Sequence, residues 1–355
     1  MTRLTAALIV IGLLGAPPAA RAQTPDERQA MMAAGTQSLV FRAFCAVDWG
    51  ATELVDSPNT FAIGQFDLFL ASTLDERISV LAEVVLEGGT ETEVVTDLER
   101  LLITYRVNDN LQVSAGRYHT GIGFYNAAFH HAAFFETPTG RPRIYLFEDE
   151  GGVLPVKEVG LTVRGSVPGT SSALRYLAEV GNGRRWIEPE SDEDRRLDEN
   201  DAKAVNFGVS YAPDLWRGVE IGGSHYRDTI PREDATSVDF QLTAAYLTYR
   251  TPSIEILAEW LWLRHSADGV RYDNDAAYVQ VSKAWGRLRP YYRYDRQTVD
   301  PSTPLIGDAG SYRAHIVGLR FDPSELVGLK AQYEHGDDRG QQGVDSVRAQ
   351  VVFVF

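Results

Sequence analysis

The chain has 355 residues, of which 44% are hydrophobic and 23% charged, and its 49 acidic and 34 basic residues give a formal net charge of -15. This composition excludes a wholly disordered chain and a polycationic nucleic-acid binder. The single cysteine, Cys45, excludes a disulfide framework, and the sequence contains no CxxC motif or Cys/His ladder to hold a structural zinc.

The first 22 residues have the organisation of a secretory signal peptide. Arg3 precedes an apolar run from Leu4 to Ala16, and the small-residue tripeptide Ala20-Arg21-Ala22 follows a Pro-Pro break. The apolar run is too short for a membrane helix, which needs about 20 residues. We therefore expect export with cleavage before Gln23, and a short periplasmic segment over residues 23–37.

Residues 38–355 divide into segments of about 10 to 14 residues with period-two alternation, separated by polar turns. A strand of about 11 residues, tilted near 45°, spans about 25 Å, which matches the apolar band of a membrane barrel, whereas sandwich strands usually have about 5 to 6 residues. The pattern predicts an all-β fold, a transmembrane antiparallel β-barrel of about 16 strands over residues 38–355. The predicted strands are 38–48, 61–73, 77–88, 94–107, 111–120, 158–168, 172–183, 202–212, 219–229, 238–251, 254–265, 275–286, 288–297, 311–322, 327–336 and 346–355.

The lengths of the connections support this segmentation. Outer-membrane barrels have short periplasmic turns and longer external loops, and the even-numbered connections here are all short. The odd-numbered ones are longer, apart from Gly89 to Glu93. The predicted long connections are Trp49 to Thr60, Gly121 to Lys157, Arg184 to Asp201, Ile230 to Ser237, Ser266 to Asn274, Thr298 to Gly310 and Asp337 to Asp345.

The alternation also predicts which face of each strand meets lipid. In the tenth segment one face carries Val238, Phe240, Leu242, Ala244 and Tyr246, and the other carries Asp239, Gln241 and Thr243. In a membrane barrel the apolar face points to lipid and the polar face lines the lumen, so we expect the first set to face outward. Trp260 and Trp262 are candidates for an aromatic girdle, and core packing is the alternative for each aromatic residue alone.

The last seven residues, Ala349-Gln350-Val351-Val352-Phe353-Val354-Phe355, resemble the terminal signal of Gram-negative outer-membrane barrels. With the strand number, the loop parity and the long third loop, the chain resembles the sixteen-stranded porins, including the phosphate-selective porin-like group. Gly116-Arg117-Tyr118-His119-Thr120, leading to His130-His131, looks like a motif of uncharacterised porin-like proteins. No lysine-rich ladder is apparent, so phosphate specificity is not implied.

The resemblance implies a location in the cell outer membrane, in contact with lipid and lipopolysaccharide. It also implies recognition of the C-terminal strand by the barrel assembly machinery, small hydrophilic solutes as cargo, and a homotrimer as a candidate assembly. No nucleic-acid partner and no cofactor are expected.

The third external loop, Gly121 to Lys157, is the candidate functional element, because connections beyond about 15 residues are uncommon unless they are functional or disordered. In the porins that the chain resembles, this loop folds into the barrel and narrows it. A surface loop without a role in the pore is the alternative. The candidate constriction residues are Phe124, Tyr125, His130, His131, Glu148, Asp149 and Glu150. No spacing fixes a third metal ligand beside the histidines, so no metal site is expected.

Alternation assigns charged residues to the lumen, with walls of opposite sign that create a transverse field. The alternative is that these charges pair with one another and only satisfy a polar interior. The predicted pore-lining bases are Arg42, Arg100, Arg106, Arg164, Arg175, Arg289, Arg293, Lys330 and Arg348, and the acids are Asp67, Glu83, Glu87, Glu220, Asp239, Glu255 and Glu259.

The function that these features favour is a porin for passive diffusion of small hydrophilic solutes. A closed structural or receptor barrel is the first alternative. A hydrolase on a barrel scaffold is the second, although the sequence has no Gly-x-Ser-x-Gly elbow to place a nucleophile beside a base. We therefore expect no enzymatic activity.

Overall fold

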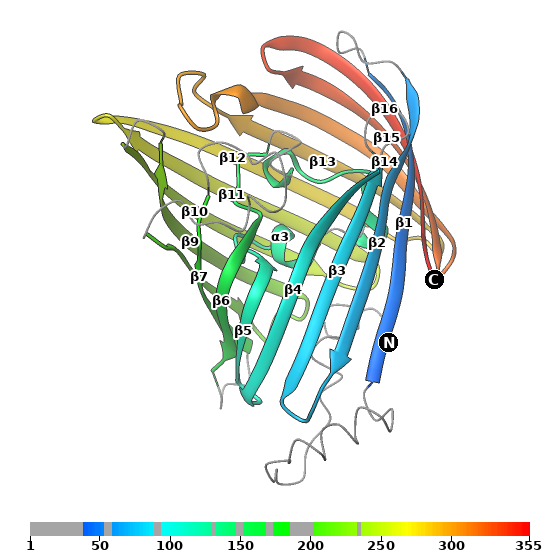
Figure 1. The fold of residues 1–355 in the computed structure, drawn as a ribbon. Coiled ribbons are helices and arrows are strands. Elements are labelled where there is room, and N and C mark those ends of the chain that lie inside the picture. The colour runs from blue at the N-terminus through cyan, green and yellow to red at the C-terminus, as the bar shows by residue number, and fades with distance from the viewer. Residues whose placement is uncertain are drawn as a thin grey trace.

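The computed structural model describes residues 38–52, 59–88, 94–129, 133–146, 152–167, 173–184, 202–232 and 236–355. Their sixteen strands form a closed antiparallel barrel in which each strand pairs with its sequence neighbours and β1 pairs with β16 (Figure 1). This confirms the predicted fold class and strand number. The predicted signal peptide and the segment 23–37 lie outside the described residues. None of the described helices is long and apolar enough to cross a bilayer.

The elements follow in chain order. They are β1 (Ser38–Thr52), β2 (Thr60–Thr73), β3 (Ile78–Gly88), β4 (Val94–Asn108), β5 (Leu111–His119), α3 (Tyr125–Ala128), η1 (Ala133–Phe135), η2 (Arg143–Tyr145), β6 (Lys157–Ser166), β7 (Ala173–Gly181), β8 (Ala204–Ala212), β9 (Val219–Pro231), β10 (Ser237–Arg250), β11 (Ile254–Ala267), β12 (Val270–Lys283), β13 (Leu288–Thr298), η5 (Gly307–Ala309), β14 (Tyr312–Ser324), β15 (Val327–Asp338) and β16 (Gln341–Val354).

The outer face of the barrel carries exposed apolar side chains. On β11 the rings of Trp260 and Trp262 stack outside the barrel with their centroids 5.1 Å apart, while the intervening Leu261 is buried on the inner side. On β4 the outward Leu101, Ile103 and Tyr105 are exposed in the same way. An apolar outer surface of this extent is typical of a barrel whose solvent is lipid.

The two ends of the barrel differ, and we call them the turn end and the loop end. At the turn end, short described connections such as 109–110 and 325–326 join the strands. The segment Gly121 to Lys157 leaves from the loop end of β5, as the parity predicts. The first residue of β1 and the C-terminus both lie at the turn end (Figure 1).

Two of the predicted long connections are wrong. Between β11 and β12 the turn is only Asp268-Gly269, and between β15 and β16 it is only Arg339-Gly340. All four residues have positive φ, from 47° to 86°, as a two-residue type I′ hairpin requires at both central positions. The charged residues of 266–274 and 337–345 therefore lie on strands that run further than the polar pattern suggested.

The wall has unequal height. Strands β5 to β8 have 9 or 10 residues each, whereas β9 to β16 have 11 to 14. Pairing between β4 and β5 runs up to Leu101 and Arg117, and β5 ends two residues later at His119. The chain turns into the barrel at this point, where the wall is low.

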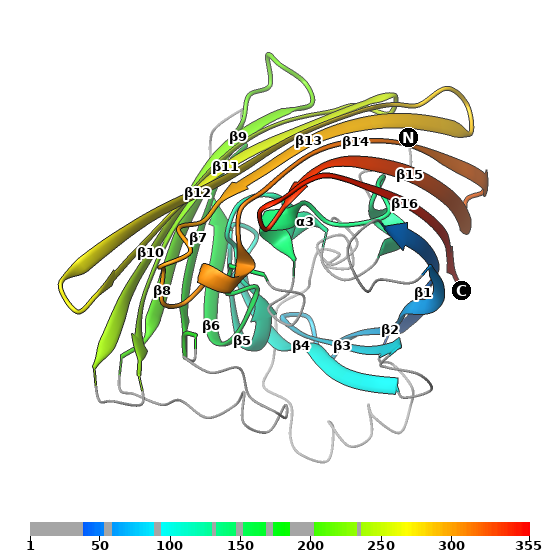
Figure 2. The same ribbon diagram turned by 90° about the horizontal axis from the view of Figure 1, so that it is seen from above.

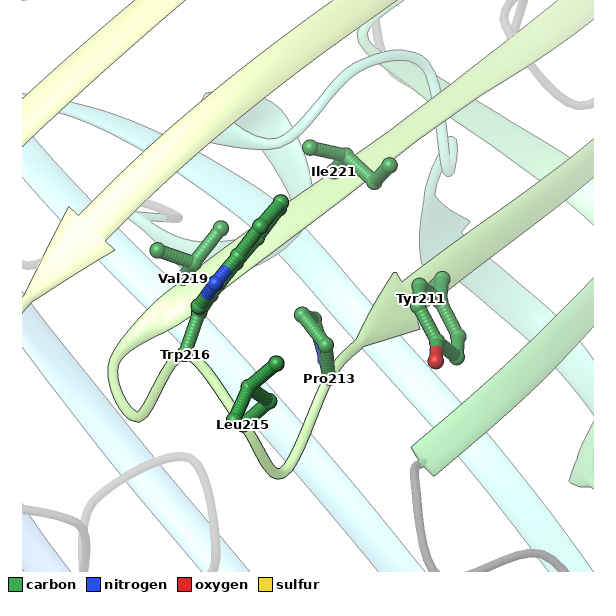
Figure 3. Close-up of a pocket in the computed structure, with 6 residues that line it drawn as sticks. All are labelled: Tyr211, Pro213, Leu215, Trp216, Val219 and Ile221. Atoms are coloured by element: carbon green, nitrogen blue, oxygen red, sulfur yellow. The ribbon is translucent and has the colours of Figure 1, made fainter.

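A groove of about 270 Å³ lies on the outer face at the turn end, around the connection between β8 and β9 (Figure 3). Its lining is apolar and includes the exposed Leu215 and Trp216. The groove belongs to the outer surface, so it is separate from the lumen. Its lining residues are Tyr211, Pro213, Leu215, Trp216, Val219 and Ile221.

Candidate functional site

Residues 120–156 connect β5 to β6 and are called loop 3 below. Figure 2 shows helix α3, which belongs to loop 3, inside the ring of strands. The two ends of loop 3 are joined: the Thr120 amide donates to the Val156 carbonyl at 2.9 Å, and the Asn126 side-chain amide donates to the carbonyls of both residues. Loop 3 therefore leaves and re-enters the wall at one place.

Loop 3 forms an apolar core with the inner wall. Phe124, Tyr125, Ile144 and Tyr145 of the loop are buried in one cluster with Leu257 and Leu261 of β11 and other wall residues. Each fully buried side chain of this kind contributes about 1.5–3 kcal/mol through removal of apolar surface from water. The wall residues in this cluster include Tyr226, Ile230, Val238, Phe240, Leu242, Ala244, Leu257, Leu261, Leu263 and Tyr278.

The prediction that the apolar face of β10 meets lipid is wrong. Val238, Phe240 and Leu242 are fully buried on the inner side, and the Tyr246 ring lies 5.6 Å from the Phe124 ring of loop 3. The inner wall is apolar here because loop 3 covers it. The outer face of the same strand carries Asp239, Gln241 and Thr243 near the loop end, and exposed Leu247 nearer the turn end.

The carboxylate of Glu259 anchors the start of loop 3. It accepts hydrogen bonds from the backbone amides of Phe124 (2.7 Å) and Tyr125 (2.9 Å) and from the hydroxyls of Tyr145 and Tyr278 (both 2.6 Å). An ionised carboxylate offers about four acceptor sites, and all of these contacts are buried. Glu259 thus holds the loop rather than presenting a free charge to the pore.

Three cationic side chains of the wall hold the middle of loop 3, and we call Arg293, Arg320 and Lys330 the cationic clamp. Each donates to two backbone carbonyls of the loop. Lys330 bonds Ala133 (2.6 Å) and Pro138 (2.9 Å), Arg320 bonds Phe134 and Glu136 (both 2.7 Å), and Arg293 bonds Gly140 (2.8 Å) and Arg141 (3.1 Å). These loop carbonyls accept from charged donors, which form stronger hydrogen bonds than neutral ones and so hold the backbone of the loop to the wall.

Further contacts fix loop 3 on other sides of the barrel. The Arg143 amide donates to Asp295 of β13 (2.8 Å), and its guanidinium lies 3.3 Å from Asp338 of β15. Thr137 donates to Glu255 of β11 at 3.2 Å. With the contact between the Ala133 amide and Gln65 of β2, these bonds place loop 3 across the lumen from one wall to the other.

Burial shifts the pKa values of titratable side chains in loop 3. Burial raises the pKa of the Glu136 carboxyl, although the charges of Arg141, Lys330 and Arg293 oppose this effect. Burial also raises the pKa of the Tyr125 and Tyr145 hydroxyls well above the ordinary value. The tyrosine hydroxyls therefore remain neutral, and that of Tyr145 can donate to Glu259.

The structure separates the predicted basic residues into two groups. Arg293 and Lys330 are only 3% exposed and belong to the clamp, so they do not line the open lumen as predicted. The others lie on the inner face. Arg100 bonds Glu83, Arg164 bonds Glu179, and Arg175 bonds Glu220, while Arg42, Arg106, Arg289 and Arg348 follow the same alternation on their strands.

The predicted acidic residues also separate. Asp67 and Glu83 are fully buried on the inner wall, and Glu220, Glu255 and Glu259 face inward with the partners described above. Asp239 is exposed on the outer face of β10, so its assignment to the pore is wrong. Its neighbours in sequence, Val238 and Phe240, take the inner positions.

Several predicted loop residues lie outside the described part of the chain, namely His130, His131, Glu148, Asp149 and Glu150, as does the side chain of Glu87. His119 is described: its Nε2 lies 3.2 Å from Glu99 in a buried pair. Within the described residues, no group of three or more His, Cys, Asp or Glu side chains is placed to hold a metal ion.

Sequence reasoning missed Asn126, Arg250 and Arg320. The guanidinium of Arg250 lies over the Phe124 ring, 4.6 Å from its centroid. Arg250 shares the face of Leu242 on β10, so the alternation would have placed it inside if that face had been assigned to the lumen. Nothing local in the sequence pairs Arg320 or Asn126 with their partners.

Comparison with known structures supports the fold. OmpF of Salmonella typhi, in a complex with daunomycin, matches with a TM-score of 0.63 at 12% identity, covering 89% of this chain and 97% of that one. The outer-membrane channel DcaP of Acinetobacter baumannii (TM-score 0.62, 11% identity) covers 90% and 97%. The anion-selective porin of Comamonas acidovorans (TM-score 0.62, 10% identity) covers 90% and 100%.

OmpT, an outer-membrane protein of Vibrio cholerae solved in a trimer form, matches with a TM-score of 0.56 at 12% identity, covering 90% of this chain and 99% of that one. No family model and no curated protein sequence matches. The likeness confirms the predicted resemblance to the sixteen-stranded porins at the level of the fold.

Proposed function

We propose that this chain is a porin of the cell outer membrane that allows passive diffusion of small hydrophilic solutes. The observation that carries the proposal is loop 3, which crosses the lumen and is bonded to β2, β11, β13, β14 and β15. A loop fixed in this way narrows a channel without depending on a ligand to hold it in place. The exposed apolar outer face and the charged inner face agree with a water-filled passage through lipid.

The structural neighbours support this choice over the alternatives. DcaP of Acinetobacter baumannii is an outer-membrane channel, and the protein of Comamonas acidovorans is an anion-selective porin. A closed structural or receptor barrel is the competing function, and it predicts a folded barrel with no conductance. The trimer form of Vibrio cholerae OmpT supports a homotrimer for this chain, which cross-linking in the membrane tests.

Planar-bilayer recording tests the proposed function. The purified, folded protein is expected to give discrete conductance steps. Deletion of residues 124–152 is expected to increase both the step size and the largest solute that enters vesicles containing the protein. A folded, inserted protein without conductance would favour the closed barrel, and unchanged conductance in the folded deletion variant would show that loop 3 is not the constriction.

A further inference from the structure

The charges that face the inner wall are distributed unequally along the barrel axis. Besides Arg320 of the clamp, the described inner face near the turn end carries six arginines, here called the basic mouth: Arg42, Arg106, Arg164, Arg175, Arg250 and Arg289. Each lies within the first or last few residues of its strand on the turn side; Arg250 is the last residue of β10 and Arg289 the second of β13. They occur on β1, β4, β6, β7, β10 and β13, and so surround the opening.

The basic mouth faces solvent. The side chains of Arg164 and Arg175 are 40% and 52% exposed, and Arg42 and Arg250 are also exposed. The acidic residues that face the inner wall near this end are fewer: Glu179 bonds Arg164, Glu220 bonds Arg175, Asp322 bonds Arg320 of the clamp, and Glu255 accepts from Thr137. Further acids lie on the turns themselves, namely Asp75, Glu76, Asp109, Asp214 and Glu325. The described inner-wall residues of this half therefore have a net positive charge, and several of the arginines face solvent.

On the other side of loop 3 the inner wall carries buried acidic residues, and some of them pair with bases of the same end, as Asp338 does with Arg143. Asp228, Asp295 and Asp338 lie towards the loop end of their strands and are buried. Glu158 accepts hydrogen bonds from Tyr226 (2.6 Å) and Tyr118 (3.4 Å). These acids are enclosed by the protein and hydrogen-bonded there, whereas the exposed arginines of the basic mouth are in direct contact with the water of the lumen.

We propose that the fixed charge of this pore is separated along its axis, so that anions are concentrated at the turn end and the channel rectifies current. This inference rests on the proposed function. This arrangement differs from the predicted transverse field, because Arg293 and Lys330 are buried in the clamp and the exposed inner-face arginines surround one opening, apart from Arg348 beside Gly140 of loop 3.

The sign of the rectification follows from the side on which anions are enriched. A voltage that drives anions from the basic mouth towards the loop end draws them from an anion-rich zone into the rest of the lumen and raises its ion content. The opposite voltage depletes the lumen of ions, because the basic mouth excludes the cations that would replace them. Current is therefore larger when the loop side is positive.

The test is a current–voltage curve from single channels in symmetric salt. In about 0.1 M salt, where the Debye length is about 10 Å, we expect roughly a twofold difference between currents at opposite voltages, and this should almost vanish in about 1 M salt. Orientation is established with Asp109→Cys, an exposed turn-end position: an impermeant thiol reagent reacts from the turn side only, because Cys45 is buried.

Matched variants identify the residues responsible. Combining Arg42→Gln, Arg175→Gln and Arg250→Gln should abolish most of the rectification, and the three Arg→Lys replacements should retain it. The control combines Arg227→Gln, Arg264→Gln and Arg313→Gln, which remove the same charge from exposed positions on the outer face, and should rectify like the unmodified protein.

The outcomes are distinguishable. Equal currents at both voltages in low salt, or larger current with the loop side negative, in a conducting protein would overturn the inference and leave the proposed function intact. Equal loss of rectification in the outer-face control would also overturn it. Absence of conductance in the folded, inserted protein would overturn the proposed function, and this inference with it.

Discussion

The ammonium group of Lys330 lies 2.6 Å from the carbonyl oxygen of Ala133, although 197 positions separate the two residues in the sequence. Lys330 is 3% exposed and also bonds the Pro138 carbonyl. A buried ammonium group carries three donors that must be satisfied, and here loop backbone carbonyls accept from it. The same contact that satisfies the lysine fixes the position of loop 3.

Lys330→Met should therefore loosen loop 3 while leaving the barrel folded. Methionine fills similar space without donors, so the Ala133 and Pro138 carbonyls lose charged partners, at a cost of about 1–3 kcal/mol. We expect larger and noisier single-channel conductance, and faster proteolysis within loop 3. Lys283→Met, at an exposed position beside Trp285, is the control and should change neither. Quiet channels of unchanged size in the Lys330 variant would contradict the role of the clamp.

Glu259→Gln should destabilise the start of loop 3. The substitution replaces an acceptor oxygen with an amide that donates, so at least one of the four donors around Glu259 loses its partner, at a cost of about 1–3 kcal/mol. The midpoint temperature at which the folded band on an unboiled detergent gel is lost should fall. Glu325→Gln, at an exposed turn position, serves as the control. Equal midpoints for both variants would show that the carboxylate does not anchor the loop.

The strand number and the long third loop could be predicted because both depend on local pattern and length. The face assignment of β10 could not, because alternation distinguishes two faces without stating which one a distant segment covers. Phe240 and Leu242 face inward and belong to the buried cluster that loop 3, more than 80 residues earlier in the sequence, forms with the wall. For the same reason, alternation alone assigns Arg293 and Lys330 to the open lumen, because it does not show that loop 3 covers them.

The strand ends were misjudged for a different reason. The polar residues around Asp268-Gly269 and Arg339-Gly340 predict external loops, although Asp-Gly is also a strong local signal for a two-residue hairpin. Near these hairpins the outer faces of the strands carry polar side chains, such as the ion pair of Arg264 and Asp273. A polar outer face near the loop end is compatible with a strand, so polarity alone does not mark where a strand ends.

Glu136 should make the stability of the folded loop pH-dependent. Burial raises its pKa above the ordinary value of 4.5, so the folded loop binds more protons than the unfolded loop in this range. Stability contributed by the protonated carboxyl is present at low pH and is lost as pH rises from about the unfolded pKa through the raised folded pKa. Glu136→Gln should remove this slope, so that loop 3 of the variant is more stable than loop 3 of the unmodified protein at neutral pH and not at acid pH.

The measurement for Glu136 is the rate of proteolysis within loop 3 across pH, corrected for the pH dependence of the protease with an unstructured peptide. The groups facing Glu136 are Tyr125, Arg141, Arg293 and Lys330. Because these groups are the same in both proteins, the difference in the pH dependence of the proteolysis rate between the variant and the unmodified protein gives the contribution of the Glu136 carboxyl. Identical slopes in the two proteins would mean that Glu136 does not titrate with loop opening.

Leu247→Arg and Asp239→Arg test the corrected orientation of β10, because both residues lie on its outer face but at different heights. Leu247 is 47% exposed among apolar neighbours, whereas Asp239 lies near the loop end, where outer-face residues are polar. An arginine on the lipid face near the bilayer midplane costs about 2–4 kcal/mol, and one near the interface costs about 0–1 kcal/mol. The yield of folding into lipid vesicles, monitored by the folded band on unboiled gels, should therefore fall strongly for Leu247→Arg and little for Asp239→Arg.

The opposite orientation of β10 gives a different result. If the face that the alternation predicts to meet lipid did so, Asp239 would point into the lumen, and Leu242→Arg rather than Leu247→Arg would show the membrane-depth penalty. Equal folding of the Leu247 and Asp239 variants would show that this face of β10 does not contact the hydrocarbon core.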